Sequence, residues 1–104
     1  LRICGFQPTE CYGLTFVHKE PREGARWWHT DPATPDTVFV LYYLQKVTAE
    51  NGCLAIRCGR EIKTVPLELG DVLILDPHHE HRSVNNSTGE FRHVIRLAIE
   101  FKRD

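Results

Sequence analysis

The chain has 104 residues, which is enough for one domain with a single core and short for an enzyme. Apolar residues make up 41% and charged residues 26%, and the net charge of -1 provides no basic surface for nucleic acid or an anionic membrane. No apolar run approaches the roughly 20 residues of a membrane span, and no signal-peptide pattern opens the chain, so we expect a cytoplasmic location.

Most of the sequence has a hydrophobic period of two and is rich in β-branched and aromatic residues. In chain order, strands are predicted over 11–19, 26–31, 37–47, 53–58, 62–69, 72–75, 81–84 and 91–101. No stretch predicts a long amphipathic helix. Seven or eight short strands with tight turns indicate an all-β fold, and a jelly-roll or double-stranded β-helix fits best.

The four cysteines contain no CxxC pair, so they form no zinc pattern: Cys4, Cys11, Cys53 and Cys58. Cys53 and Cys58 lie on opposite faces of one predicted strand and are not expected to pair with each other. Buried free thiols are expected. Two overlapping glycosylation sequons in 85–88 are interpreted as a polar turn.

The last predicted strand, 91–101, alternates between a strongly apolar face and a face that carries Arg92 and Arg96. If Arg92 points into a barrel, the apolar face points outward. An exposed apolar stripe of that size normally meets a partner surface. We therefore expect the stripe to be covered either by flanking elements outside this chain or by another subunit in a homo-oligomer.

Three residues form the candidate metal site: His29, Asp31 and His81. Positions two apart on a strand share one face, so His29 and Asp31 offer two ligands from one short element. His81 follows an apolar strand that ends in a bend, which can bring a third ligand beside the first two. Two imidazoles and a carboxylate are the ligands of the facial triad, which holds non-haem Fe(II) and leaves an open face. His79 shares the parity of His81 and is the rival third ligand.

Arg92 supplies a planar cation that is suited to gripping a carboxylate. The alternative is a surface arginine paired with Glu90 or Glu100. Ser83 is placed to add a hydroxyl hydrogen bond to the same anion, and Arg96 is a weaker alternative clamp.

These residues lie within three longer segments, WWHTDP, ENGCLAI and VPLELGDVLILDPHHEHRSVNNSTGEFRHVIRL. The segments resemble the Fe(II)/2-oxoglutarate-dependent dioxygenases, most closely the phytanoyl-CoA dioxygenase-like branch. The resemblance covers roughly residues 26–101 and implies a double-stranded β-helix.

The resemblance also implies a site and a reaction. His29, Asp31 and His81 would bind Fe(II), and Arg92 with Ser83 would bind the co-substrate 2-oxoglutarate. The implied reaction uses O₂ to couple the oxidative decarboxylation of 2-oxoglutarate to succinate with oxidation of an unidentified small molecule or peptide. Related halogenases lack the carboxylate that Asp31 supplies, so hydroxylation is the implied chemistry.

The chain departs from this family in three respects. After ENGCL, the family's long insertion over the substrate is missing, and so are the N-terminal helices that buttress its larger sheet. The upstream contact to the co-substrate has only candidates, which are Lys19, Tyr42 and Tyr12. The chain also begins with Leu and contains no Met. Residues 1–104 are therefore interpreted as one catalytic core, a fragment or minimal form without flanking helices and lid.

Two other functions remain open. A set of residues resembles the second cupin motif: Gly70, Asp71, Pro77, His81 and Asn85. This favours a cupin-like metal-binding protein or a 2-oxoglutarate-independent metalloenzyme, although Asp31 occupies the place of the second histidine of the first cupin motif. The third hypothesis is a non-catalytic jelly-roll interaction module.

Overall fold

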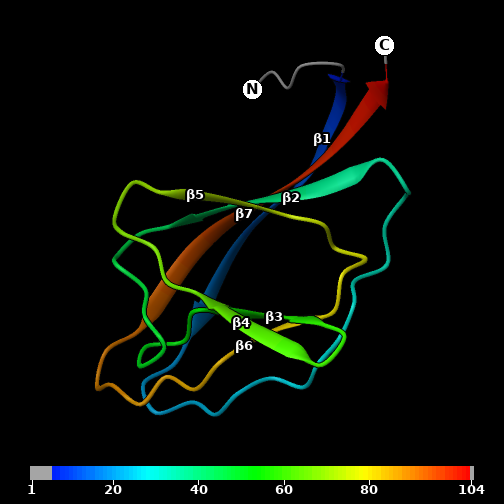
Figure 1. Cartoon of the computed structure of the whole chain (residues 1–104). Helices are drawn as coiled ribbons and strands as arrows, with labels where there is room; N and C mark the ends of the chain where they lie inside the picture. Colours follow the sequence, from blue (N-terminus) through cyan, green and yellow to red (C-terminus); the bar gives the residue numbers. More distant parts are fainter. Residues whose placement is uncertain (1–5, 104) are drawn as a thin grey trace.

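The computed structural model describes residues 6–103, with side chains from 14 to 101, and contains seven β-strands (Figure 1). The strands are β1 (Phe6–Lys19), β2 (Thr37–Tyr43), β3 (Leu54–Cys58), β4 (Glu61–Val65), β5 (Val72–Leu75), β6 (His81–Ser83) and β7 (Arg92–Arg103). No helix occurs in residues 6–103, which confirms the all-β prediction. That part of the chain therefore has no helix long and apolar enough to cross a membrane.

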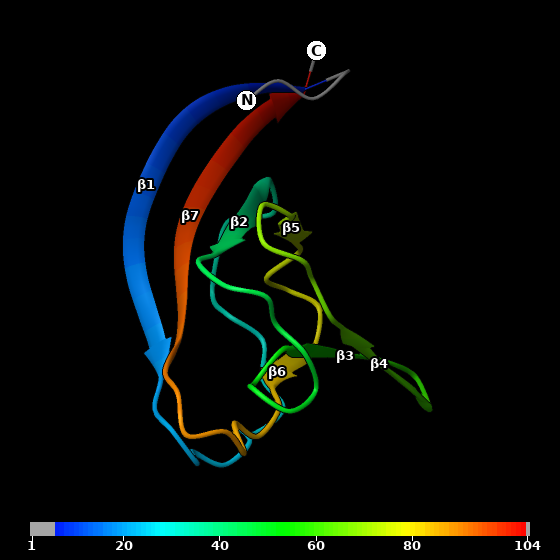
Figure 2. The same cartoon turned by 90° about the vertical axis from the view of Figure 1, so that its left-hand side faces the viewer.

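The strands form two antiparallel sheets. The larger sheet has the order β1-β7-β2-β5, and the smaller sheet has the order β4-β3-β6. The last strand lies between the first two, so neighbours in space are distant in sequence, as in the predicted double-stranded β-helix. In Figure 2, β1 and β7 curve together along one side of the molecule, and β3 and β4 project on the other side.

The core lies on the inner face of the larger sheet. Phe39, Leu41 and Tyr43 alternate along β2 and are all buried, as expected for a strand with one face toward the core. β2 pairs with β5 on one edge and with β7 on the other, so it lies in the interior of the sheet. Val94 and Ala98 of β7 belong to the same buried cluster.

The outer face of the larger sheet carries apolar side chains. Register places Phe16, Ile95, Tyr42 and Val72 in one row across its four strands. Phe16, Tyr42 and Val72 are exposed in this chain. The prediction that the apolar face points outward is confirmed in this row, but Ile99 and Phe101 of the predicted stripe are buried with Val40 in a second cluster. The cover of the exposed part stays a prediction.

The predicted strand over 26–31 is wrong, because only His29 forms a bridge, with His81. The amide of His29 bonds to the carbonyl of His81, while the amide of Arg26 bonds to the carbonyl of Ser83. Residues 26–29 therefore advance by three positions while residues 81–83 advance by two. The additional residue interrupts the ladder as in a β-bulge.

Other predicted elements end differently. β2 stops at Tyr43 and not at Val47, because the side chain of Gln45 bonds to both the amide and the carbonyl of His93. β4 ends at Val65 because the next residue is Pro66, which has no amide hydrogen.

The cysteine predictions are confirmed in part. Cys53 and Cys58 are both free thiols. Cys53 is buried, but Cys58 is exposed because it ends β3 in the projecting β3–β4 hairpin. Cys4 and the side chain of Cys11 lie outside the described residues.

Candidate metal and anion site

A cavity of about 160 Å³ lies between the inner face of the larger sheet and the β6 region. Its lining includes two groups of polar side chains. We call His29, Asp31 and His81 the metal end, and Lys19, Ser83 and Arg92 the anion end. All five residues predicted for the site therefore line one cavity, together with Lys19.

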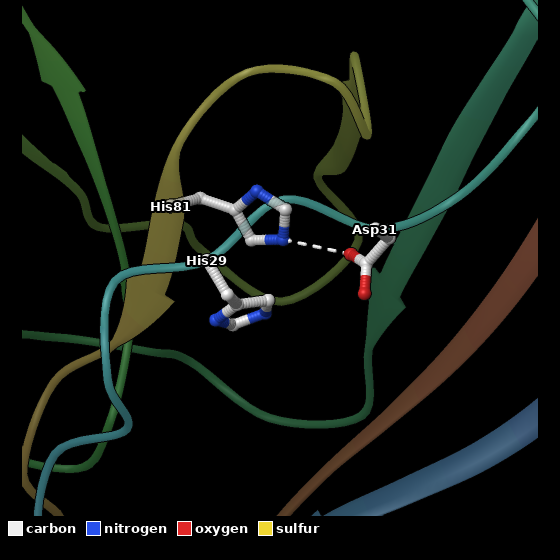
Figure 3. A group of neighbouring side chains, drawn as sticks. All are labelled: His29, Asp31 and His81. Atoms are coloured by element: carbon white, nitrogen blue, oxygen red, sulfur yellow. Dashed lines mark hydrogen bonds and ion pairs between the residues drawn. The ribbon is translucent and has the colours of Figure 1, made fainter.

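The metal end brings together two residues of a loop and one of a strand (Figure 3). Each side chain offers one ligand atom, and these atoms lie within 4.8 Å of one another. The bridge between His29 and His81 fixes the two histidines side by side, with ring centroids 4.5 Å apart. The amide of Asp31 donates to the carbonyl of Pro77 at 2.8 Å, which holds the loop against the segment before β6.

Both histidines are oriented in the same way by the backbone. Nδ1 of His29 lies 2.7 Å from the carbonyl oxygen of Trp27, and Nδ1 of His81 lies 2.6 Å from that of His79. A carbonyl oxygen only accepts, so in both rings Nδ1 carries the hydrogen. The lone pair of each neutral ring is then on Nε2, which is how a metal-binding histidine is usually held.

The contact between His81 and Asp31 tests whether these residues fit a metal ion. Nε2 of His81 lies 3.0 Å from Oδ2 of Asp31. With the hydrogen on Nδ1, a neutral His81 would direct a lone pair at a carboxylate oxygen. A cation or a second ring proton between the two atoms removes this repulsion. Neighbouring ligands of a metal with bonds of about 2.1 Å lie about 3 Å apart, so the residues fit a metal ion.

The anion end contains two cations that lie opposite each other in the sheet. Lys19 of β1 pairs in register with Arg92 of β7. Their exposed fractions are 1% and 5%, so both charges are almost completely removed from solvent. Burial lowers the pKa of both Lys19 and Arg92, and the Arg92 charge lowers that of Lys19 further. Two buried like charges destabilise each other unless an anion lies near both.

The described residues provide only part of that compensation. Nζ of Lys19 donates to Oγ of Ser83 at 2.9 Å and lies 3.6 Å from a carboxylate oxygen of Glu23. Nη1 of Arg92 donates to the carbonyl of Gly52, but its Nε is buried and has no hydrogen-bond partner. The anion end can therefore accept the carboxylate of a ligand.

Sequence reasoning missed two residues that contact the anion end. Gly52 has φ of +97°, and a Cβ atom there would lie 2.8 Å from Cδ of Lys19. The ring of Tyr43 lies under Arg92, with 5.6 Å between the guanidinium carbon and the ring centroid. Only the fold brings the turn at Gly52 to β1 and β7.

The structure also separates the predicted residues from their rivals. Nε2 of His79 lies 3.0 Å from the carbonyl oxygen of Arg57 and 3.3 Å from Sγ of Cys58, so this ring faces β3 and not the metal end. Of the three candidates for the upstream contact, Lys19 is buried in the cavity and Tyr42 is exposed on the outer face. The side chain of Tyr12 lies outside the described residues.

Comparison with solved structures identifies chains of the same shape. SnoK, a non-haem alpha-ketoglutarate-dependent carbocyclase from nogalamycin biosynthesis, has a TM-score of 0.78 and 18% identity over 89% of this chain. The chain therefore has the double-stranded β-helix fold of SnoK. EvdMO1 has a TM-score of 0.76 and 24% identity over 93% of the chain, and CytC3, solved with Fe(II) and alpha-ketoglutarate, has 0.67 and 17% over 85%.

The chain covers 28% of EvdMO1, 50% of SnoK and 42% of CytC3, so it spans half or less of each. No protein-family model and no curated protein sequence matches it. The resemblance to the phytanoyl-CoA dioxygenase-like branch therefore stays a prediction.

Proposed function

We propose that this chain is the catalytic core of an Fe(II)- and 2-oxoglutarate-dependent dioxygenase that hydroxylates its substrate and converts 2-oxoglutarate and O₂ to succinate and CO₂. The observation that carries the proposal is one cavity lined by both a two-histidine, one-carboxylate group and a buried pair of cations. A metal site alone serves many chemistries, and a cation pair alone binds many anions. A diacid that chelates a metal at one end needs both.

The residues take distinct roles. His29 and His81 would bind Fe(II) through Nε2, and Asp31 through a carboxylate oxygen. The bound iron would supply the activation of O₂ and the oxidative decarboxylation of the co-substrate. Arg92 and Lys19 would hold the far carboxylate of 2-oxoglutarate.

Several contacts prepare these residues before any ligand binds. Gly52 fixes Arg92 through its carbonyl, and Ser83 fixes the ammonium of Lys19. The backbone carbonyls that accept from Nδ1 of the two histidines keep both rings turned toward the cavity. Prepared groups of this kind position a reactant without reorganisation.

Known proteins of this fold support the pairing of iron with 2-oxoglutarate, because CytC3 was solved with both. SnoK is a carbocyclase, so the fold serves more than one outcome. Asp31 favours hydroxylation, because the family resemblance implies that related halogenases lack this carboxylate.

One experiment tests this function against both alternatives. Fe(II) and 2-oxoglutarate are added to the protein without oxygen, and the visible charge-transfer band of the chelate is recorded. Zn(II) serves as the matched control, because its filled d shell gives no such band. We expect a band with Fe(II) and succinate after oxygen is admitted.

The other outcomes are equally informative. Iron binding without a band would rule out the proposal and leave the cupin-like metalloprotein. A band without succinate on adding oxygen would favour a non-catalytic module that retains the ligands.

A further inference from the structure

Arg96 is a third cation of the cavity, and the proposed function does not use it. It lies on β7 four residues after Arg92, on the same inward face, and it lines the same cavity as the metal end. At about 3.3 Å per residue, the Cα atoms of the two arginines are about 13 Å apart. The cavity therefore has cationic groups at two separate levels along one strand.

The surroundings of Arg96 leave its charge without an acidic partner among the described side chains. Its Nε is buried and makes no hydrogen bond, and no ion pair among the described side chains includes it. Two carboxylates line the cavity, and both are engaged elsewhere: Glu23 faces Lys19, and Asp31 faces His81. A partly buried guanidinium without an acidic partner is stabilised when an anion binds.

The contact that Arg96 does make is with an aromatic ring. Its guanidinium carbon lies 4.7 Å from the centroid of the Phe39 ring, which is buried in the core. A contact with a ring face does not consume the N–H donors in the guanidinium plane. Phe39, Leu41 and Leu75 give this level of the cavity an apolar lining.

We propose that Arg96 binds the anionic group, a carboxylate or a phosphate, of the substrate that is oxidised, and that the apolar body of this substrate packs against Phe39 and Leu75. The inference rests on the proposed function, because it assigns the anion end to 2-oxoglutarate and leaves Arg96 for the second reactant. Arg96 is thus a residue that determines substrate specificity.

The test uses small aromatic probes with and without the proposed anionic group, because the substrate itself is unidentified. Benzoate, phenyl phosphate and neutral benzamide are titrated by ligand-observed NMR into the full chain loaded with diamagnetic Zn(II) and 2-oxoglutarate. The variants are Arg96→Leu, Arg96→Gln, Arg96→Lys and, as a charge-matched control, Arg60→Leu. Arg60 is exposed and does not line the cavity.

We expect the anion that fits, benzoate or phenyl phosphate, to bind at least about tenfold more weakly to Arg96→Leu and Arg96→Gln, because a charge-assisted hydrogen bond is lost. Arg96→Lys should retain part of the affinity, Arg60→Leu should retain all of it, and benzamide should be unaffected. The comparison of the two anions identifies the group that is recognised. Arg96→Gln serves if Arg96→Leu does not fold.

Separate readouts distinguish this inference from the proposed function. The Fe(II) chelate band should form equally in wild type and Arg96→Gln. Unchanged anion binding in the variants, no binding of either anion to wild type, or a loss of 2-oxoglutarate affinity in place of probe affinity would overturn the role of Arg96. Absence of the band in wild type, with probe binding still dependent on Arg96, would refute the iron enzyme and keep the anion site.

Discussion

The two cations of the anion end lie on the two longest described strands, whereas the metal end is formed by a loop and the first residue of a three-residue strand. Lys19 and Arg92 are neighbours in a long antiparallel ladder. His29 is attached to His81 by a single bridge, and Asp31 is held by one amide bond to Pro77.

The difference follows from the charges that each end has to hold. Two buried cations side by side tend to move apart, and only a scaffold with many backbone bonds keeps them in place. Metal ligands of the loop instead gain from small shifts toward an ion. We infer that the anion end is prepared by the fold, while the metal end completes its geometry when the ion binds.

The largest expected effect comes from removing a metal ligand. Asp31→Ala should weaken Fe(II) binding by at least about 100-fold, because even residues that only orient metal ligands contribute about 10- to 100-fold. Metal affinity is measured by calorimetry without oxygen. His79→Ala is the control, because it keeps the backbone carbonyl that accepts from His81. Similar losses in both variants would show that the metal end is assigned wrongly.

Arg92→Ala should break the anion end and spare the metal end. We expect 2-oxoglutarate affinity to fall about 10- to 100-fold, since hydrogen bonds to charged groups contribute about 1.5–3 kcal/mol. Fe(II) affinity, measured without 2-oxoglutarate, should change little. An equal loss of both affinities would contradict the role assigned to Arg92.

Lys19→Met should have a smaller effect, about tenfold on 2-oxoglutarate, because Arg92 remains. Burial lowers the pKa of Lys19 below its ordinary value of 10.5. Raising the pH through this lowered pKa removes the ammonium proton, so wild type should lose affinity in the alkaline range below pH 10.5, and the variant should lack this step. Lys46→Met, at an exposed lysine paired with Glu68, should behave as wild type. A step that persists in Lys19→Met would have another origin.

The smallest effect on binding is expected from Gly52→Ala. Comparing this variant with Gly59→Ala separates the effect of close packing from that of backbone strain. The new Cβ would displace Lys19, so unfolding free energy should fall by about 1–3 kcal/mol, and 2-oxoglutarate affinity should fall a few-fold. Gly59→Ala also has a positive φ, +62°, but open space around it, so only strain of about 1–2 kcal/mol is expected. Urea unfolding measures both. If Gly59→Ala also weakens 2-oxoglutarate, the effect is not local to Lys19.

Much of this architecture could be predicted from local patterns. Alternating apolar residues identified β2 and β7, and their parity correctly turned Arg92 inward. The prediction of a strand over 26–31 was wrong because a bulge depends on the strand that the segment pairs with, here 81–83, and not on the segment itself. His79 and His81 have the same parity, and only the contact of His79 with Arg57 and Cys58 separates them.

The sequence by itself determined the all-β class, because periodicity is a local property. It also predicted five site residues that the structure brings to one cavity: His29, Asp31, His81, Ser83 and Arg92. The tertiary structure decided which lysine joins the site, which carbonyl holds Arg92, and that Arg96 shares the cavity without an acidic partner. These facts depend on β1, β7 and the turn at Gly52 meeting in space. Segments so far apart in sequence meet only through long-range strand pairing, which a local pattern does not encode.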